Sequence, residues 1–334
     1  MRYNQLGRTG LFVSELCLGT MTFGAAGANG QWGQIAKVDQ EAADRLVERS
    51  LAAGINFIDT ANVYSFGESE RILGQSLKNL GVRRQDVVIA TKFHGQMGAG
   101  PNERGSSRGH IMDQVEQSLE RLGTDHIDLY QVHGTDTVTP IDETLRALDD
   151  LVSRGLVRYV GVSNWQAWRI AKALGISRRE GLARFELVQP MYNLVKRQAE
   201  VELFPLVMEE GLGAMVYSPL ASGLLTGLYG LDRRPETGRL AQPRYTQRYG
   251  DDAFYAVADR FSTFARDNGH APAALAVAWA RSHPAVTAPI VGADTPEQLD
   301  GILAALDIAM TPDLRAAITA LSIPPDESIE REVD

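Results

Sequence analysis

Short apolar runs recur along almost the whole chain and alternate with longer stretches of helical periodicity. Several runs are continuously apolar, which is typical of parallel strands covered by helices on both faces. The expected strands are residues 15–20, 57–61, 87–92, 127–133, 157–164, 187–193, 213–219 and 287–293. Eight strands alternating with helices predict an α/β protein, and their number favours a closed (β/α)8 TIM barrel over an open doubly wound sheet.

The clearest helical pattern runs from residue 110 to 123, where apolar side chains recur every three or four positions. Ser107 is the expected N-cap of this helix and Gly123 its expected end. Residues 140–154 carry a similar pattern, which Gly155 closes. Helices of this length are sufficient to connect successive parallel strands.

Two segments depart from the alternation. Residues 3–16 hold two short apolar runs around a turn at Gly7–Gly10, which predicts an N-terminal β-hairpin that caps the bottom of the barrel. Residues 220–250 have no clear periodicity, and loops this long in a compact domain are usually functional or disordered. Because no glycine- or proline-rich linker divides the chain, we expect residues 1–334 to form one domain.

Composition and charge narrow the class of protein. Of the 334 residues, 44% are hydrophobic and 22% are charged, which is close to the average for soluble globular proteins. The net charge is −9, which argues against nucleic acid as a partner. The longest apolar stretch, residues 273–280, is too short to cross a membrane, and the start of the chain lacks a signal-peptide pattern. We therefore expect a cytoplasmic protein with no membrane partner.

Four polar side chains follow consecutive expected strands: Asp59, Tyr64, Lys92 and His133. Residues just past the strand ends of a (β/α)8 barrel converge on one mouth. A free tyrosine, with a pKa of about 10, donates protons poorly near neutrality. An ammonium about 4 Å away would favour its phenolate by roughly 4 kcal/mol at an effective dielectric constant near 20. The grouping therefore predicts carbonyl reduction, although each residue alone also fits an ordinary polar strand end.

Motifs along the chain resemble those of the aldo-keto reductase superfamily. They are GINFIDTANVYSFGESE (54–70), VIATK (88–92), LYQVH (129–133), GVSNW (161–165), QPMYN (189–193) and YSPLASGLLTG (217–227). Residues 103–122 are similar to the branch that contains potassium-channel β-subunits and bacterial relatives. The resemblance implies a barrel that binds a nicotinamide dinucleotide without a Rossmann fold. It also implies Asp59, Tyr64, Lys92 and His133 as catalytic residues, with Tyr64 as general acid.

The resemblance also implies a set of cofactor-binding residues. Gly19, Thr20 and Met21 would line the nicotinamide ribose, with Asp59 beside them, and Ser163, Asn164 and Gln189 would hold the carboxamide. Tyr217 would stack on the nicotinamide ring, and Ser218, Pro219, Leu220 and Gly223 would follow the pyrophosphate. Arg239 would contact the cofactor, and Gly292, Asp294 and Gln298 complete the set.

Asp294 departs from the family pattern, which commonly has serine or arginine facing the 2′-phosphate of NADP. A carboxylate about 5 Å from this phosphate would repel it by at least ~1–2 kcal/mol even when screened. Aspartate would instead accept hydrogen bonds from ribose hydroxyls, as acidic residues do in NAD sites of other folds. The family default is NADP(H), whereas Asp294 predicts weakened discrimination or a preference for NAD(H).

Two local patterns allow other interpretations. Tyr192 and Lys196 match the Tyr-x-x-x-Lys pattern of short-chain dehydrogenases, but they follow a strand late in the chain and no N-terminal glycine fingerprint accompanies them. Five arginines in the segment 220–250 suit either a clamp on an anionic ligand or an exposed loop: Arg233, Arg234, Arg239, Arg244 and Arg248.

The expected substrate is a small-molecule carbonyl compound, an aldehyde or a ketone. Phe23, Trp32, Tyr64, Phe93 and Trp165 are candidates for an aromatic substrate pocket. Two other functions stay open: a cofactor-sensing regulatory or scaffold subunit, and a dehydrogenase that oxidises an alcohol or sugar. Whether the chain forms a homo-oligomer is open as well.

Overall fold

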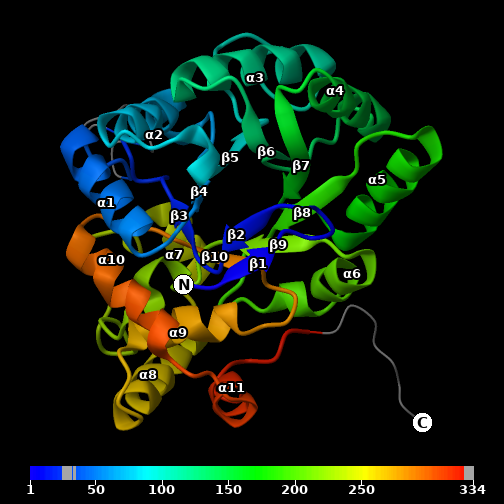
Figure 1. The fold of residues 1–334 in the computed structure, drawn as a ribbon. Coiled ribbons are helices and arrows are strands. Elements are labelled where there is room, and N and C mark those ends of the chain that lie inside the picture. Colours follow the sequence, from blue (N-terminus) through cyan, green and yellow to red (C-terminus); the bar gives the residue numbers. More distant parts are fainter. Residues whose placement is uncertain (25–31, 33–34, 327–334) are drawn as a thin grey trace, which may run out of the picture.

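Eight parallel strands close into a barrel, so the predicted (β/α)8 architecture is confirmed (Figure 1). The computed structural model describes residues 1–24, 32 and 35–326. The strands are β3 (Cys17–Gly19), β4 (Phe57–Asp59), β5 (Val88–Phe93), β6 (Ile127–Val132), β7 (Val157–Ser163), β8 (Phe185–Gln189), β9 (Gly213–Val216) and β10 (Ala288–Val291). They follow one another around the barrel in chain order, and β10 closes it against β3.

Helices surround the strands (Figure 1). They are α1 (Gln40–Ala52), α2 (Glu68–Asn79), α3 (Arg108–Leu122), α4 (Ile141–Ser153), α5 (Ala167–Glu180), α6 (Leu203–Glu210), α7 (Pro243–Tyr249), α8 (Asp252–Asp267), α9 (Pro272–Arg281), α10 (Pro296–Leu303) and α11 (Pro312–Thr319). The predicted ends of α3 are confirmed. Ser107 accepts a hydrogen bond from the amide of His110, and Gly123 ends the helix in the left-handed conformation, with φ of 64°.

Burial on both faces explains the continuous apolar runs. Side chains on the outer face of the strands pack against the helices, and a smaller cluster that includes Phe57, Leu129 and Met215 fills the barrel. Leu6 and Val13 of the N-terminal segment join this inner cluster and are fully buried. The barrel is thus a packed core with an N-terminal plug.

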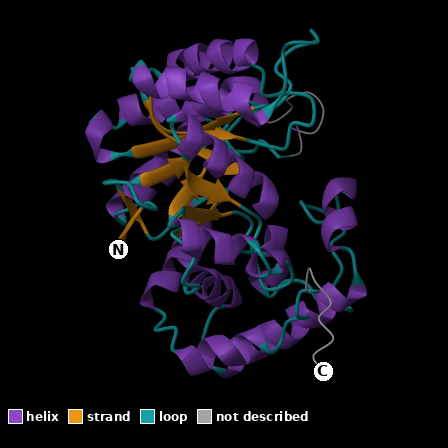
Figure 2. Ribbon diagram, turned by 90° about the vertical axis from the view of Figure 1, so that its right-hand side faces the viewer, coloured by secondary structure: helices purple, strands orange, loops and turns teal. Residues whose placement is uncertain are grey.

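The N-terminal plug is the predicted hairpin, formed by β1 (Tyr3–Gln5) and the antiparallel β2 (Phe12–Ser14). Gly7 lies in its turn with φ of +55°, and a Cβ atom there would lie 2.7 Å from the carbonyl oxygen of Glu186. Only glycine fits such a left-handed position without a clash. In the side view, the N-terminus lies at the left-hand end of the orange strands (Figure 2).

The segment 220–250, which has no clear periodicity in the sequence, contains two ordered elements. Residues 221–226 form a 3-10 turn, η5 (Ala221–Thr226), and residues 243–249 form α7. Pro243 begins α7, and the apolar face of this helix consists only of Tyr245 and Tyr249, one turn apart and buried. Two aromatic residues among polar neighbours are too few to give a periodic signal in the sequence.

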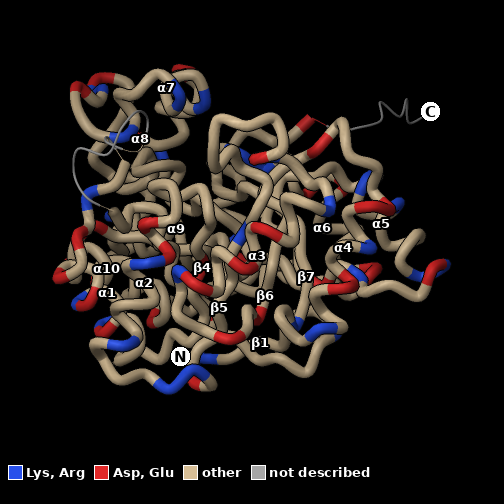
Figure 3. The backbone as a smooth tube through the Cα atoms, turned by 90° about the horizontal axis from the view of Figure 1, so that it is seen from above, with Lys and Arg blue, Asp and Glu red and all other residues tan. Residues whose placement is uncertain are grey.

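Charged side chains of both signs are spread around the molecule (Figure 3). Among the described residues, no helix combines the length and apolar character needed to cross a membrane.

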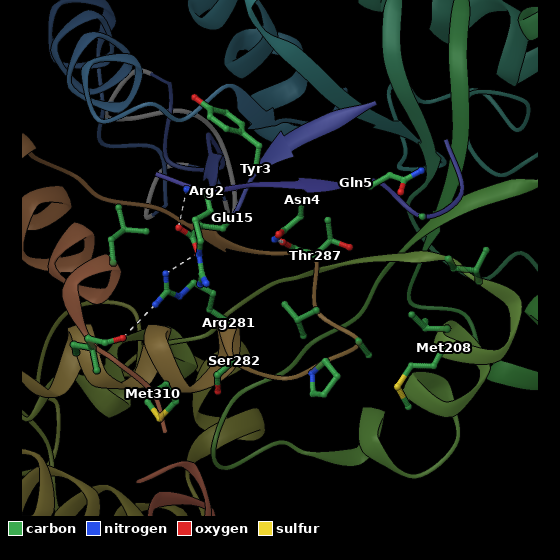
Figure 4. Close-up of a pocket in the computed structure, with 18 of the residues that line it drawn as sticks. Arg2, Tyr3, Asn4, Gln5, Glu15, Met208, Arg281, Ser282, Thr287 and Met310 are labelled. Carbon is green, nitrogen blue, oxygen red and sulfur yellow. Dashed lines mark hydrogen bonds and ion pairs between the residues drawn. The ribbon is translucent and has the colours of Figure 1, made fainter. Parts of the chain in front are cut away.

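A cavity of about 1260 Å³ opens beside the N-terminal hairpin (Figure 4). Its polar lining includes Glu15, whose carboxylate lies 2.8 Å from Arg2 Nη2 and 2.7 Å from Arg281 Nη1. Arg281 also donates to the carbonyl oxygen of Ala305. The Glu15 and Arg281 side chains are 4% and 8% exposed, so this pair joins the hairpin to α9 as a nearly dry ion pair.

Replacing Glu15 with alanine is expected to lower the free energy of unfolding by about 3 kcal/mol at neutral pH, because the Arg281 guanidinium stays buried without its carboxylate. Burial alone raises the pKa of Glu15, but hydrogen bonds from Arg2 and the charge of Arg281 hold the pKa below its usual value. The pair therefore stabilises the fold above the unfolded pKa of about 4.3, and this contribution is lost as the pH falls through the folded pKa. Urea unfolding of the wild-type protein and Glu15→Ala at neutral and acidic pH measures the effect. An equal difference in their free energies of unfolding at both pH values would contradict the prediction.

Candidate active site

The carboxyl ends of β4 and β5 hold a buried ion pair. Lys92 Nζ lies 2.6 Å from Asp59 Oδ2 and 2.8 Å from the carbonyl oxygen of Thr60. Lys92 is completely buried, and Asp59 is 3% exposed. Burial alone lowers the pKa of Lys92, but the charge of Asp59 and the hydrogen bonds to Asp59 and Tyr64 outweigh it and raise the pKa above its usual value. The lysine therefore stays an ammonium ion at neutral pH.

Tyr64 points its hydroxyl group at this ammonium. The Tyr64 hydroxyl oxygen lies 3.3 Å from Lys92 Nζ. Tyr64 begins the 3-10 turn η2 (Tyr64–Gly67), in which Ser65 and Phe66 have φ of 49° and 53°. Left-handed non-glycine residues cost of order 1–2 kcal/mol each and persist where the surroundings fix them. The turn between β4 and α2 thus holds the phenol in place at an energetic cost.

The pKa of the Tyr64 phenol differs from the sequence-based expectation. Burial raises this pKa more than the Lys92 ammonium lowers it, so the pKa lies above its usual value. We expected a pKa below that value, because the lysine can be recognised in the sequence but the depth of burial cannot. In the free protein the phenol therefore keeps its proton at neutral pH, with the ammonium as the group that strengthens its acidity.

His133 completes the group that the sequence singled out. Its ring centroid lies 5.6 Å from that of Tyr64, with the rings edge to face. Burial and the nearby positive charge of Lys92 lower its pKa well below the usual value, so the imidazole is neutral at physiological pH. The structure thus brings Asp59, Tyr64, Lys92 and His133 to one end of the barrel.

Two glutamine residues orient Asp59 from the barrel interior. Gln189 Nε2 lies 2.9 Å from Asp59 Oδ1, and Gln131 Nε2 lies 3.4 Å from the same oxygen. The sequence analysis placed Gln189 at the cofactor and missed Gln131. Gln131 pairs with Lys92 in the parallel register of β5 and β6, so it projects to the same side as the lysine. The pairing of these two strands is therefore the feature that identifies Gln131 as a residue of the site.

Ser163, Asn164 and Tyr217 form a hydrogen-bonded chain on the far side of His133. The Tyr217 hydroxyl donates to Asn164 Oδ1 at 2.7 Å, and Asn164 Nδ2 lies 3.0 Å from the carbonyl oxygen of His133. Ser163 Oγ donates to the carbonyl oxygen of Gln189 at 2.8 Å. Asn164 is exposed and Tyr217 is half-buried, so both are accessible to a ligand at the mouth.

The turn after β9 has the backbone form of an anion site. Ser218, Ala221, Ser222 and Gly223 have φ of 57°, 49°, 59° and 104°, and they follow closely along the chain together with Pro219 and Leu220. A run of left-handed residues is a backbone form that recurs in phosphate sites, and here the N–H groups of Ala221 and Gly223 donate to the carbonyl oxygens of Ser218 and Leu220. A Cβ atom at Gly223 would meet only the Tyr229 ring, at 3.7 Å, so there is space beside this residue.

The other predicted cofactor residues lie on either side of β3. Gly19 ends β3, and a Cβ atom there would lie 2.6 Å from Ile290 Cγ2, so a side chain at this position would push the wall of the barrel apart. Thr20 is buried and Met21 is half-buried. Gly292 and Asp294 lie between β10 and α10, and Gln298 lies in the first turn of α10, where its Oε1 accepts from the amide of Asp294 at 3.0 Å.

Four of the five arginines of residues 220–250 fall into two groups, and the fifth, Arg248, lies in the last turn of α7. Arg233 pairs with Asp259, and Arg234 pairs with Asp252, so both make surface ion pairs. The guanidinium carbons of Arg239 and Arg244 lie 5.9 and 6.0 Å from the ring centroid of Tyr245. The region around α7 carries several of these basic positions (Figure 3).

Three aromatic residues proposed for a substrate pocket have other contacts. Phe93 faces away from Lys92, is fully buried and packs 4.8 Å from the Tyr130 ring. Phe23 is fully buried in the main core, and Trp165 packs edge-on against Phe185. Trp32 lies edge-on against Tyr64, with ring centroids 5.7 Å apart. Strand alternation explains the direction of Phe93, since neighbours of an inward residue point outward.

Tyr192 and Lys196 do not form the catalytic pair of a short-chain dehydrogenase. The Tyr192 hydroxyl donates to Glu200 Oε1 at 2.5 Å, and Lys196 Nζ lies over the Phe254 ring. The two side chains therefore have separate partners.

The class of this protein follows from its similarity to a known family. A model of the aldo/keto reductase family matches residues 15–323. The chain belongs to this family and is an NAD(P)H-dependent aldo-keto reductase, as the motifs indicated.

Relatives of this chain match it over nearly its full length. It is 38% identical over 330 residues to a "Probable voltage-gated potassium channel subunit beta" of Oryza sativa subsp. japonica, with 96% of each chain covered. It is 37% identical over 322 residues to the "Uncharacterized oxidoreductase YrpG" of Bacillus subtilis (strain 168), with 94% of each chain covered. A "Versiconal hemiacetal acetate reductase" of Aspergillus parasiticus is 34% identical over 334 residues, with 94% of each chain covered.

Proposed function

We propose that this enzyme reduces an aldehyde or ketone to the alcohol, with Tyr64 donating the proton to the carbonyl oxygen. The observation that carries the proposal is the phenol 3.3 Å from a fully buried ammonium, which is itself paired with Asp59. Reduction leaves negative charge on the carbonyl oxygen, and a nearby phenol with an ammonium behind it supplies a proton and stabilises that charge.

Each neighbour of Tyr64 has a distinct part in this proposal. Lys92 strengthens the acidity of the phenol, and Asp59 keeps Lys92 charged. Neutral His133, at the other edge of the Tyr64 ring, donates a hydrogen bond to the carbonyl oxygen and orients it. The raised pKa of Tyr64 keeps the proton available for transfer at neutral pH.

The residues around the mouth fit a nicotinamide dinucleotide, which supplies the hydride when bound. Tyr217, with Asn164 and Ser163 beside it, offers a ring and an amide to the nicotinamide end. The turn of residues 218–223, in which Ser218, Ala221, Ser222 and Gly223 are left-handed, would lie along the pyrophosphate. Gln189 and Gln131 lie within hydrogen-bond distance of Asp59, and Gln189 would also hold the carboxamide. Gly19, Thr20, Met21, Arg239, Gly292 and Gln298 complete the proposed binding surface.

Asp294 is the proposed determinant of cofactor choice. Its carboxylate would repel a 2′-phosphate and accept hydrogen bonds from a 2′-hydroxyl, which favours NADH. Replacing Asp294 with arginine is expected to shift the ratio of kcat/KM for NADPH over NADH upward by about tenfold, or ~1.4 kcal/mol. Steady-state kinetics with both cofactors measures the ratio. Asp300→Arg, on the helix α10 that follows Asp294, is the control. An unchanged ratio in Asp294→Arg would reject the assignment.

A regulatory subunit is a second candidate, since the relative from Oryza sativa subsp. japonica is a probable channel subunit by name. A panel of carbonyl compounds, tested with NADH and NADPH in parallel and followed by nicotinamide absorbance, separates the two. Turnover that is lost in Tyr64→Phe supports the reductase. Cofactor binding without turnover of any compound would favour the sensor.

A further inference from the structure

A further buried ion pair joins the helix that follows the Tyr64 turn to the next helix along the chain. Glu70 and Arg121 have side chains that are 0% and 6% exposed, and Arg121 Nε lies 2.6 Å from Glu70 Oε2. The other oxygen of Glu70 accepts a hydrogen bond from Thr91 Oγ1, also at 2.6 Å. One carboxylate therefore joins the first turn of α2, the strand β5 and the end of α3.

The contact between Glu70 and Thr91 is important because Thr91 is the neighbour of Lys92 on β5. Thr91 precedes Lys92 on β5, and successive side chains of a strand point to opposite faces. Lys92 points into the mouth, so Thr91 points outward to the helices, where Glu70 holds it. On the inner side, the amide of Asn62 donates to the carbonyl oxygen of Lys92 at 3.0 Å. The segment that carries Tyr64 is thus attached to β5 on both sides, before and after the turn.

Arg121 also supports the turn itself. Gly67 ends η2 with φ of 93°, and a Cβ atom there would lie 2.6 Å from Arg121 Cδ and 2.9 Å from its Nε. The arginine therefore packs on the backbone of the strained turn while it pairs with Glu70. Its Nη2 donates to Ser118 Oγ at 3.1 Å, which fixes the guanidinium against α3.

The neighbouring residue Ser69 makes an analogous connection to the other strands. Ser69 Oγ donates to the carbonyl oxygen of Thr20 at 2.8 Å and lies 3.0 Å from Thr60 Oγ1. Thr60 in turn accepts the hydrogen bond from Lys92 Nζ at its carbonyl oxygen. The first turn of α2 is therefore attached to β5 through Glu70 and to the ends of β3 and β4 through Ser69.

We propose that Glu70, held by Arg121, is a positioning residue that fixes the distance between the Tyr64 hydroxyl and the Lys92 ammonium by attaching α2 to Thr91. The inference rests on the proposed role of Tyr64 as general acid. Loosening the attachment lets the phenol move away from the ammonium, so the proton is transferred less often and the phenol becomes a weaker acid. Cofactor binding does not depend on the attachment.

Four variants test the proposal in the full-length enzyme with its cofactor. Thr91→Val removes one hydrogen bond and keeps the Glu70–Arg121 pair, whereas Thr91→Ser keeps the hydroxyl. Glu70→Gln removes the charge. Asp128→Asn is the matched control. Asp128 pairs with Arg84 and also accepts a hydrogen bond from the amide of Ile89, which lies on β5 three residues before Lys92.

We expect kcat to fall by about tenfold in Glu70→Gln and about threefold in Thr91→Val, since small displacements of reacting groups are costly. In both variants the KM for the cofactor stays within about twofold of the wild-type value. The alkaline limb of the pH–kcat/KM profile, which reports the Tyr64 phenol, moves to higher pH in both. Thr91→Ser keeps the wild-type profile, and Asp128→Asn loses thermal stability while its kcat and alkaline limb stay unchanged.

A wild-type kcat and alkaline limb in folded Thr91→Val would overturn the proposal, as would an equal loss of kcat in Asp128→Asn. Because Thr91→Val keeps the ion pair, it decides the question even if Glu70→Gln does not fold. Tyr64→Phe in the same series distinguishes a failure of the positioning role from a failure of the proposed function. If Tyr64→Phe retains turnover, Tyr64 is not the general acid. If Tyr64→Phe loses turnover while Thr91→Val behaves as wild type, only the positioning role of Glu70 is rejected.

Discussion

Tyr64→Phe is expected to lower kcat for carbonyl reduction by about 10³-fold, which corresponds to ~4 kcal/mol of transition-state stabilisation. The phenylalanine ring keeps the edge contacts with Trp32 and His133 but has no proton to give. Cofactor affinity should change little, because the hydroxyl's hydrogen bond is to Lys92. Steady-state kinetics and cofactor titration by fluorescence measure the two effects.

Tyr3→Phe is the control for this substitution, since it removes a phenol from β1 of the N-terminal hairpin, where the hydroxyl donates to the carbonyl oxygen of Gly54. It should keep wild-type kcat. A loss in Tyr64→Phe smaller than about tenfold would be too small for a general acid and would contradict the assignment.

Lys92→Met is the second large effect, with an expected fall in kcat of about 10²-fold. Without the ammonium, the phenol is left with the burial that raises its pKa, so it becomes a weaker acid. The sign of the pH effect follows: the alkaline limb of the profile moves to higher pH. A profile with an unchanged limb would show that the lysine does not act on the phenol.

This variant also leaves the Asp59 carboxylate buried without its cation, which is expected to destabilise the fold. The double variant Lys92→Met/Asp59→Asn restores neutrality at the site while Gln189 and Gln131 keep their amides near residue 59. It should recover thermal stability relative to Lys92→Met but not kcat. Recovery of both would mean that the loss came from misfolding.

The barrel could be predicted because its strands are buried on both faces, which leaves unbroken apolar runs in the sequence. The convergence of Asp59, Lys92 and His133 followed from the same topology, since each lies at the carboxyl end of a parallel strand. Tyr64 could be included in the predicted site because it lies five positions after Asp59, which is close enough for its side chain to reach Asp59 and Lys92.

Three features were beyond the sequence for physical reasons. The net pKa of Tyr64 depends on the depth of its burial, which no local pattern reports. Glu70 contacts Thr91 and Arg121, which lie 21 and 51 positions away along the chain. A single buried charged residue leaves no periodic pattern in the sequence, so these contacts could not be predicted. Helix α7 buries only two tyrosines, so its apolar face is too narrow to stand out.

The most direct test of the account is the pH dependence of the single-turnover rate of carbonyl reduction, measured by stopped flow with wild-type enzyme and Tyr64→Phe at saturating cofactor. We predict a wild-type rate that is constant near neutrality and falls at alkaline pH as the phenol loses its proton, and a slow Tyr64→Phe rate without that fall. The same alkaline limb in both proteins would show that another group donates the proton.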